Sequence, residues 1–211
     1  TSRCRGLRSG RTKMPTPAEN SALLIGTFPP LPVGVALTAA TQPFAQTFDR
    51  RFATGAAYQT VSGTLVITGI WLPQGQLVTG ITFVSGATGE TGGTHLWYAL
   101  YRGDTGALMA QSTDDTGATS FGANVALRKA LTSAQTCPVT GLYYLCFLAT
   151  HSAGTVPTLI SGNAAVANGN GSITGMTPIL AATADTGLTT TAPATMGAKT
   201  TIVQSIYACV D

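Results

Sequence analysis

Apolar and polar residues alternate most clearly over residues 95–111, which read HLWYALYRGDTGALMAQ. Leu96, Tyr98 and Leu100 fall on one face of an extended strand, and the residues between them fall on the other face. This period of two, together with the aromatic content, is typical of a strand in a packed sheet. The glycines and the aspartate of residues 102–106 suit a tight turn. The pattern therefore predicts a β-hairpin that needs a second sheet to cover it.

Strand-sized apolar segments recur along the chain between clusters of glycine, proline and polar residues. We predict further strands over residues 64–72, 77–85, 123–131, 142–149, 176–180 and 200–209. The alternation in the first of these is imperfect, so we expect a bulge at Gly69. Residues 142–149 are so apolar that both faces of this strand should be buried. Because no segment has a helical period, we predict an all-β protein, a jelly-roll-like antiparallel β-sandwich.

The apolar strands should share one core. We expect its most buried members to include Leu65, Ile67, Trp97, Leu100, Tyr144 and Phe147. Trp71, Trp97, Tyr143 and Tyr144 lie within apolar strands, which favours core packing over an exposed role. Tyr58 and Phe121 lie in loop-like contexts and are therefore the better candidates for an exposed aromatic platform.

Basic residues are concentrated at the beginning of the chain. Five of the 11 basic residues lie within the first thirteen positions: Arg3, Arg5, Arg8, Arg11 and Lys13. The other six stand against eight acidic residues, so the +3 charge of the chain divides into a basic leader and a remainder, residues 14–211, of net charge −2. A basic segment with little apolar content is disordered alone and binds an acidic surface.

An apolar, proline-rich stretch follows the basic residues. Pro29, Pro30 and Pro32 enforce extended geometry. Its exposed apolar side chains need a partner surface; they include Leu23, Leu24, Ile25, Phe28 and Leu31. We therefore predict two parts, an extended N-terminal arm over residues 1–44 that serves as the attachment device, and a β-sandwich domain over residues 45–211 that folds without it.

Composition points to a subunit of an assembly. Hydrophobic residues make up 44% of the chain and charged residues only 9%, against about 25% charged residues in an average soluble protein. A surface with so little charge is poorly protected against association, so we expect the body to self-associate symmetrically, as a homotrimer. No apolar run is long enough for a transmembrane helix. We expect neither a membrane partner nor a specific nucleic-acid partner.

Few residues suggest a reaction or a metal. The chain lacks the short motifs of serine hydrolases, zinc proteases and nucleotide-binding loops. Asp114 and Asp115 are adjacent, so they point in opposite directions on an extended chain and make a poor acid–base pair. His95 and His151 have no thiol or carboxylate cluster near them in sequence, and the four cysteines form no CxxC pair. We predict a non-enzymatic protein without cofactor or metal.

Two further features of the sequence stay open. A disulfide between Cys137 and Cys146 is one alternative, and free thiols are the other. Arg102-Gly103-Asp104 spells the integrin-binding tripeptide, but it lies where a hairpin turn calls for glycine and aspartate anyway. Asn170-Gly171-Ser172 satisfies the glycosylation sequon, which has meaning only in a eukaryotic secretory context.

Three stretches together carry a resemblance: SGTLVITGIWLPQGQLVTGITFVSG, LWYALYRGDTGALMAQSTDD and LTSAQTCPVTGLYYLCFLAT. Over about residues 62–158 the chain resembles β-sandwich structural proteins of tailed bacteriophages, particularly those that infect actinobacteria. The resemblance implies a location in the virion, after assembly in the host cytoplasm, and it transfers no catalytic residue.

The resemblance and the basic arm together suggest a function. We expect a capsid decoration (cement) protein whose arm lies along the major capsid protein on the outside of the phage head. One alternative is a minor tail or tail-tip protein anchored to tail tube proteins. The other is a carbohydrate-binding, lectin-like adhesion module, which requires exposed aromatic side chains.

Overall fold

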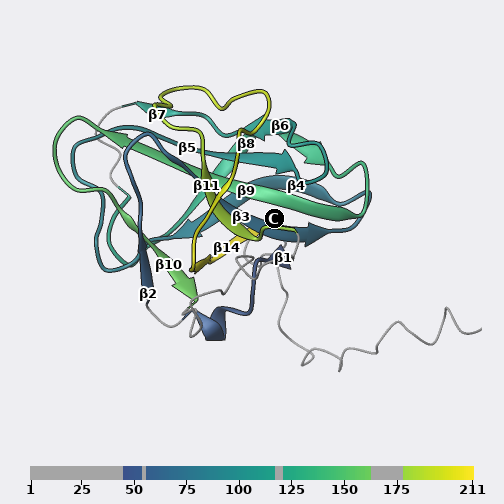
Figure 1. Cartoon of the computed structure of the whole chain (residues 1–211), viewed down its shortest axis with the longest axis horizontal. Coiled ribbons are helices and arrows are strands. Elements are labelled where there is room, and N and C mark those ends of the chain that lie inside the picture. The colour runs from purple at the N-terminus through teal and green to yellow at the C-terminus, as the bar shows by residue number, and fades with distance from the viewer. Residues whose placement is uncertain (1–44, 54–55, 117–120, 163–177) are drawn as a thin grey trace, which may run out of the picture. The chain divides into compact units, whose positions relative to one another are not determined.

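The computed structural model describes residues 45–53, 56–116, 121–162 and 178–211 of this chain (Figure 1). A boundary between two units of the chain falls after Thr38. The first unit lies outside the described residues, as does the predicted boundary near Phe44, so the following account concerns the second unit alone.

The described residues form three antiparallel sheets. Sheet A has the strand order β1 (Ala45–Gln46), β14 (Ala208–Val210), β4 (Leu77–Val84) and β8 (Ala126–Thr136). Sheet B has the order β13 (Ser205–Ile206), β10 (Thr158–Gly162) and β2 (Ala56–Gln59). Sheet C has the order β12 (Thr200–Thr201), β11 (Ala181–Ala184), β3 (Leu65–Leu72), β9 (Gly141–His151), β5 (Gly93–Arg102) and β6 (Leu108–Gln111), and β7 (Asp115–Thr116) also pairs with β5. A short 3₁₀ helix, η1 (Arg50–Phe52), completes the described elements.

The predicted hairpin is present as β5 and β6. Their register places Ala99 opposite Gln111 and Leu100 opposite Ala110. Gly106, in the turn, has a φ of +69°, a conformation that favours glycine. The alternation along β5 is also confirmed, because Leu96 and its alternate neighbours face one hydrophobic cluster while Trp97 and its alternate neighbours face another.

The strand β9 lies at the centre of sheet C, between β3 and β5. Its residues from Tyr143 to Ala149 are buried on both faces, as the apolar run predicted. It pairs without a shift with β3 from Val66 to Leu72. Sheet C is therefore the middle layer of the molecule, with material packed against each of its faces.

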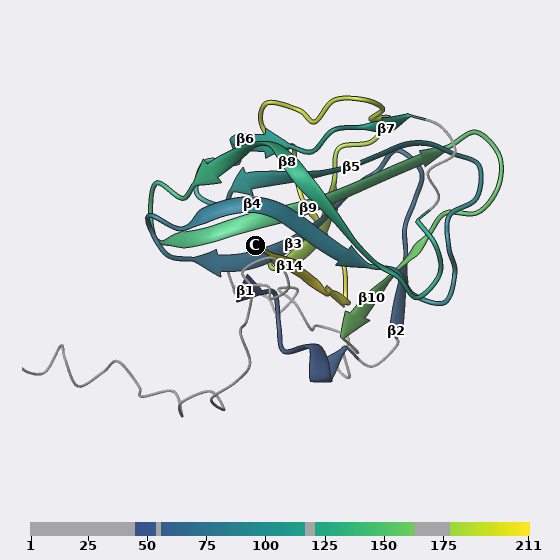
Figure 2. The same cartoon turned by 180° about the vertical axis from the view of Figure 1, so that it is seen from behind.

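One face of sheet C packs against sheet A, and Figure 2 shows β4 and β8 lying over β5 and β9. We call the cluster between the two sheets the inner core. Phe147 is at its centre, with ring centroids at 5.6 Å from Phe83, 5.7 Å from Tyr98 and 5.9 Å from Phe121. This packing of two antiparallel sheets confirms the predicted all-β sandwich. The jelly-roll order of connections and the extended arm stay predictions.

The opposite face of sheet C packs against residues 185–199, which we call the cover segment. Leu188, Ala192 and Met196 of this segment contact an outer core that includes Trp97 and Tyr144. In Figure 1 the yellow-green end of the chain passes across this side of the molecule. The six predicted core residues are all buried, but the prediction of one core is wrong. Leu100 and Phe147 belong to the inner core, whereas Leu65, Ile67, Trp97 and Tyr144 belong to the outer core.

One detail of the strand predictions, the bulge at Gly69, is wrong. No bulge occurs at Gly69, which pairs in register with Tyr144. A Cβ on Gly69 would lie 3.1 Å from Leu142 Cδ1 and 3.3 Å from Leu180 Cδ2, so the glycine is explained by close packing. Register shifts occur instead in β4, between Val78 and Gly80, and in β5, between Leu100 and Tyr101 and between Gly93 and His95.

Strand boundaries differ from prediction in three places. The strand predicted over residues 123–131 begins at Ala126 and continues to Thr136 as β8. The strand predicted over residues 176–180 is instead β11, Ala181–Ala184, and residues 176 and 177 lie outside the described part. The last predicted strand, 200–209, is divided into β12, β13 and β14, which join sheets C, B and A respectively. The C-terminal residues thus connect all three sheets.

Cys137, Cys146 and Cys209 are free and buried. The alternative of a Cys137–Cys146 disulfide is therefore ruled out in this structure. Burial raises the pKa of each of the three thiols, so they act as small apolar side chains rather than as nucleophiles.

Candidate functional site

The predicted attachment residues, from Arg3 to Leu31, all lie outside the described residues. The same is true of the sequon at residues 170–172. A candidate site in the body must therefore be built from side chains that sequence reasoning assigned to other roles.

Trp71 is exposed, although its strand context predicted core packing. Its side chain lies on the outer-core face of β3, where Leu65 and Ile67 are buried. It retains 64% of its accessible surface. The cover segment contacts the beginning of β3, where the Leu65 N–H donates to the Asp185 carbonyl, and the burial of this face declines toward the end of the strand.

Two leucines accompany Trp71 on the same face. Leu142 lies opposite Trp71 in the register of β3 and β9. Leu180 meets Leu142 over Gly69 and is 38% exposed. We call Trp71, Leu142 and Leu180 the Trp71 patch. It offers an aromatic ring beside aliphatic side chains, which suits an apolar or carbohydrate surface rather than a reaction.

The two aromatic residues that the sequence favoured for an exposed platform are not available for it. Phe121 is only 1% exposed and packs in the inner core against Phe147. Tyr58 lies in β2, is half-buried and packs against the same core. Burial also raises the pKa of the Tyr58 hydroxyl. Both predictions are wrong, because the apparent loops lie against the sandwich.

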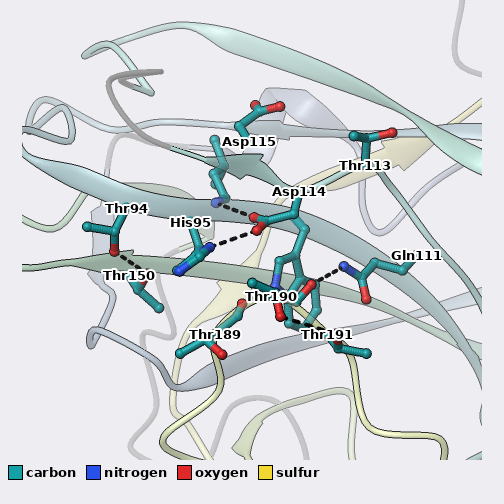
Figure 3. A network of polar contacts seen from close by, with 12 residues as sticks. Thr94, His95, Gln111, Thr113, Asp114, Asp115, Thr150, Thr189, Thr190 and Thr191 are labelled. Atoms are coloured by element: carbon teal, nitrogen blue, oxygen red, sulfur yellow. Dashed lines mark hydrogen bonds and ion pairs between the residues drawn. The ribbon is translucent and has the colours of Figure 1, made fainter.

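Asp114 and Asp115 have separate partners, as their adjacency predicted. His95 Nδ1 lies 2.7 Å from Asp114 Oδ2, as Figure 3 shows, and the N–H of Leu96 donates to the other oxygen of Asp114 at 3.1 Å. Asp115 forms an ion pair with Lys129 at 2.6 Å. In the described part of the chain, no hydroxyl or thiol is hydrogen-bonded to His95 Nε2. The histidine–aspartate pair therefore fastens the segment before β7 to β5.

Polar contacts also fasten the cover segment to β5 and β6 (Figure 3). Trp97 Nε1–H donates to the Thr189 carbonyl at 2.6 Å. Gln111 donates to the Thr190 carbonyl at 2.8 Å and accepts from the Ala192 N–H at 2.6 Å. An irregular segment needs such partners when it is buried, since its backbone groups have no ladder of their own.

Glu90 is a buried carboxyl near the end of the sandwich where Lys129 and Asp115 meet. It is 2% exposed, and its Oε2 accepts a long hydrogen bond of 3.4 Å from the Phe121 N–H. Among the described residues, its Oε1 has no hydrogen-bond partner. Burial raises the pKa of Glu90, and the negative charge of Asp115 raises it further. Nothing in the local sequence indicated this, because Glu90 stands alone in a glycine-rich loop.

The tripeptide Arg102-Gly103-Asp104 serves the hairpin turn. Arg102 Nε donates to Asp104 Oδ1 at 3.0 Å, so the two charges neutralise each other. The Gly103 N–H donates to the Leu142 carbonyl at 2.9 Å, and a Cβ at residue 103 would lie 2.5 Å from that oxygen. The glycine is therefore required by this close approach, without reference to a receptor.

Two searches of the described residues found nothing. No group of three or more histidine, cysteine, aspartate or glutamate side chains could hold a metal ion there. In the same part of the chain, no helix is long and apolar enough to cross a membrane.

Comparison with known proteins gives no family for this chain. No protein-family model, curated protein or solved structure matches it.

Proposed function

We propose that this chain is a non-enzymatic structural protein of a virion, a capsid decoration protein that binds the outside of a phage head through residues 1–44. The partner is the major capsid protein, and the decorating unit is a homotrimer. The resemblance of residues 62–158 to phage β-sandwich proteins motivates the proposal, and the all-β sandwich is compatible with it.

The distribution of charge is the observation that supports this proposal most directly. Within the described body, four ion pairs join an arginine or lysine to an aspartate, and His95 also contacts Asp114. Paired charges leave little field outside the protein, so neighbouring copies can be crowded on a lattice without strong repulsion. By contrast, the first thirteen residues hold five basic side chains and no acidic one. The net positive charge is thus concentrated in the segment that must find an acidic partner.

Deletion of residues 1–44 tests this division of roles. The truncated chain should lose binding to isolated heads, while the midpoint of its thermal unfolding stays nearly unchanged. Binding is measured by cosedimentation with heads and unfolding by circular dichroism. Raising the salt concentration should weaken only the contribution of the basic residues, since exposed charges are screened within about 10 Å at 0.1 M salt.

The control for this experiment is the full chain with Trp71→Ser, which keeps the arm and removes the exposed ring. It should bind heads as the unaltered chain does. If the truncated chain still occupies heads fully, the sandwich itself makes the contact and the proposal is wrong. Labelling of virions with antibodies against this chain distinguishes head from tail, and a label on the tail would favour the minor tail protein.

The oligomeric state is tested separately. Light scattering of the purified chain at micromolar concentration should give the mass of a trimer. A monomer under these conditions would contradict self-association of the body. The chain would then be held in the assembly only by its contact with the partner surface.

The Trp71 patch favours a second candidate, a carbohydrate-binding adhesion module. An exposed tryptophan beside aliphatic side chains can stack on the apolar face of a sugar ring. A glycan array probed with the full chain and with Trp71→Ser tests this candidate. Binding that is lost in the variant would support it, and no binding by either chain would exclude it for the glycans on the array.

A further inference from the structure

Lys129 occupies an unusual position for a lysine. Along β8, Leu127, Lys129 and Leu131 point toward sheet C, and the residues between them are exposed. The side chain of Lys129 is only 8% exposed. A lysine is almost never buried to this extent without a specific partner.

The partner of Lys129 belongs to the other sheet. Lys129 Nζ lies 2.6 Å from Asp115 Oδ2, so the pair joins β8 of sheet A to β7 of sheet C. Other contacts close the same seam between the sheets: Ser112 forms a β-bridge with Leu131, and the Thr132 hydroxyl donates to the Gln111 carbonyl at 2.8 Å. The amine and the carboxyl are therefore held together by backbone elements on both sides.

Glu90 completes the set of chemical groups. Its burial raises its pKa, and the negative charge of Asp115 raises that pKa further. Its Oε1 makes no hydrogen bond. Tyr98, whose pKa is raised by burial and by both carboxyl groups, lies in the same region, and its hydroxyl is also without a partner. Two buried polar atoms without a partner among the described residues, near the pair of buried Lys129 and partly exposed Asp115, call for an explanation.

A simpler interpretation accounts for part of this arrangement. β8 is the edge strand of sheet A, and an inward-pointing charge on an edge strand protects against pairing with other chains. That role explains Lys129 and its counter-ion Asp115. It does not explain why a second carboxyl with an unused oxygen is buried close by, at the cost of its desolvation.

We propose that Lys129 and Asp115 condense to an intramolecular amide bond that links the two sheets covalently. The lysine amine attacks Asp115 Cγ, a C–N bond forms, and the bond from Cγ to one carboxyl oxygen breaks. That oxygen leaves as water with two of the three protons of the ammonium group. The third proton stays on the amide nitrogen, so atoms and charges balance without an oxidant or a co-reactant.

Physical reasons favour this product over the ion pair. The ammonium group of Lys129, whose side chain is 8% exposed, carries a desolvation penalty, whereas an amide is neutral. Two reacting groups held in contact by the fold react as if at very high concentration. Glu90 is the carboxyl that transfers the protons, because it is buried, its Oε1 accepts no hydrogen bond from the described residues, and it is near enough to Asp115 to be affected by that charge. After the reaction, its free oxygen is available to accept the amide N–H.

The mass of the intact chain, measured after denaturation and reduction, tests the proposal directly. The expected mass is that of the sequence minus one water. A mass equal to that of the sequence overturns the proposal and leaves an ordinary ion pair. A tryptic digest should also show no cleavage after Lys129 and one branched peptide that joins the segments containing Asp115 and Lys129.

Three variants identify the atoms involved. Asp115→Asn should form the same bond with loss of ammonia instead of water, so its mass deficit changes in a defined way. Lys129→Arg should show the full mass of its sequence. The matched control is Lys199→Arg, because Lys199 lies over the ring of Tyr144 on the outer face; it should keep the loss of one water. A loss of water that persists in Lys129→Arg overturns the assignment.

Glu90→Gln tests the proton transfer. Freshly purified Glu90→Gln should contain a large fraction of chain at the full sequence mass, and this fraction should decline slowly on storage. A merely structural role of Glu90 would not produce a mass difference between folded samples of equal age. Complete reaction at the rate of the unaltered chain would remove Glu90 from the mechanism.

Discussion

The two faces of sheet C are both buried, but by different kinds of material. On the inner face, regular strands of sheet A supply apolar side chains such as Phe83, which packs on Phe147. On the outer face, the irregular cover segment supplies small and flexible residues such as Ala192 and Met196. The inner face is covered by a second hydrogen-bonded sheet, and the outer face is covered by a segment without regular backbone hydrogen bonding.

The polar tips of aromatic residues show the same contrast. On the outer face, Trp97, Tyr101 and Tyr144 each donate to a backbone carbonyl, of Thr189, Pro193 and Ile179 respectively. On the inner face, the Tyr143 hydroxyl donates to the Val139 carbonyl at 2.7 Å, whereas the Tyr98 hydroxyl has no partner among the described residues. An irregular cover has carbonyl groups to be satisfied, whereas a facing strand has already satisfied its own. Hydrogen bonds from these aromatic side chains therefore go to irregular backbone on either face, and Tyr98 lacks one because it faces regular strands.

The largest expected effect is at the inner face. Phe147→Ala should lower the free energy of unfolding by about 3–5 kcal/mol, because it removes a fully buried ring from the centre of an aromatic cluster. Chemical denaturation followed by tryptophan fluorescence measures the change. Trp71→Ser is the control and should stay within about 0.5 kcal/mol of the unaltered chain. Equal losses in both variants would contradict the described burial.

The second prediction contrasts two tyrosines on opposite faces of β5. Tyr101→Phe removes the hydrogen bond to the Pro193 carbonyl, measured here at 2.8 Å, and should destabilise the protein by about 0.5–1.5 kcal/mol. Tyr98→Phe removes a hydroxyl that is buried without a partner and should be neutral or stabilising. Equilibrium denaturation of the two variants gives the comparison.

Hydrogen exchange locates the effect of Tyr101→Phe. The amide of Met196, which donates to the Gly106 carbonyl, should exchange faster in this variant because the cover segment opens locally. Exchange in β9 should change little. A uniform loss of protection in both regions would show that the cover segment does not open separately from the sandwich.

The smallest effect depends on pH. Burial raises the pKa of Glu90, so the folded state binds this proton more tightly than the unfolded state. Its contribution to stability is therefore greatest below the ordinary carboxyl range and is lost as the pH rises through the raised pKa. Each unit of increase costs about 1.4 kcal/mol at high pH. Urea unfolding across this range should show a flatter pH profile for Glu90→Gln, and parallel profiles would contradict it.

Local patterns in the sequence were sufficient for the hairpin and for the central strand. The alternation around Trp97 predicted both faces of β5, and the apolar run predicted that β9 is buried on each side. Such predictions succeed because side-chain direction in a strand follows from position alone. The opposite orientation of Asp114 and Asp115 followed from the same rule.

Only the tertiary structure decided what covers each face. Trp71 and Ile67 lie on the same face of one strand, yet only Ile67 is buried, because the extent of the cover segment is a long-range property. Phe121 looked like a loop residue, but its loop folds against Phe147. The ion pair of Lys129 with Asp115, and the effect of Asp115 on the pKa of Glu90, likewise depend on how sheets A and C pack at this edge. The sequence by itself determined the strands and the direction of their side chains. Which of these side chains are buried, and which groups they bind, depends on contacts between residues far apart in the chain.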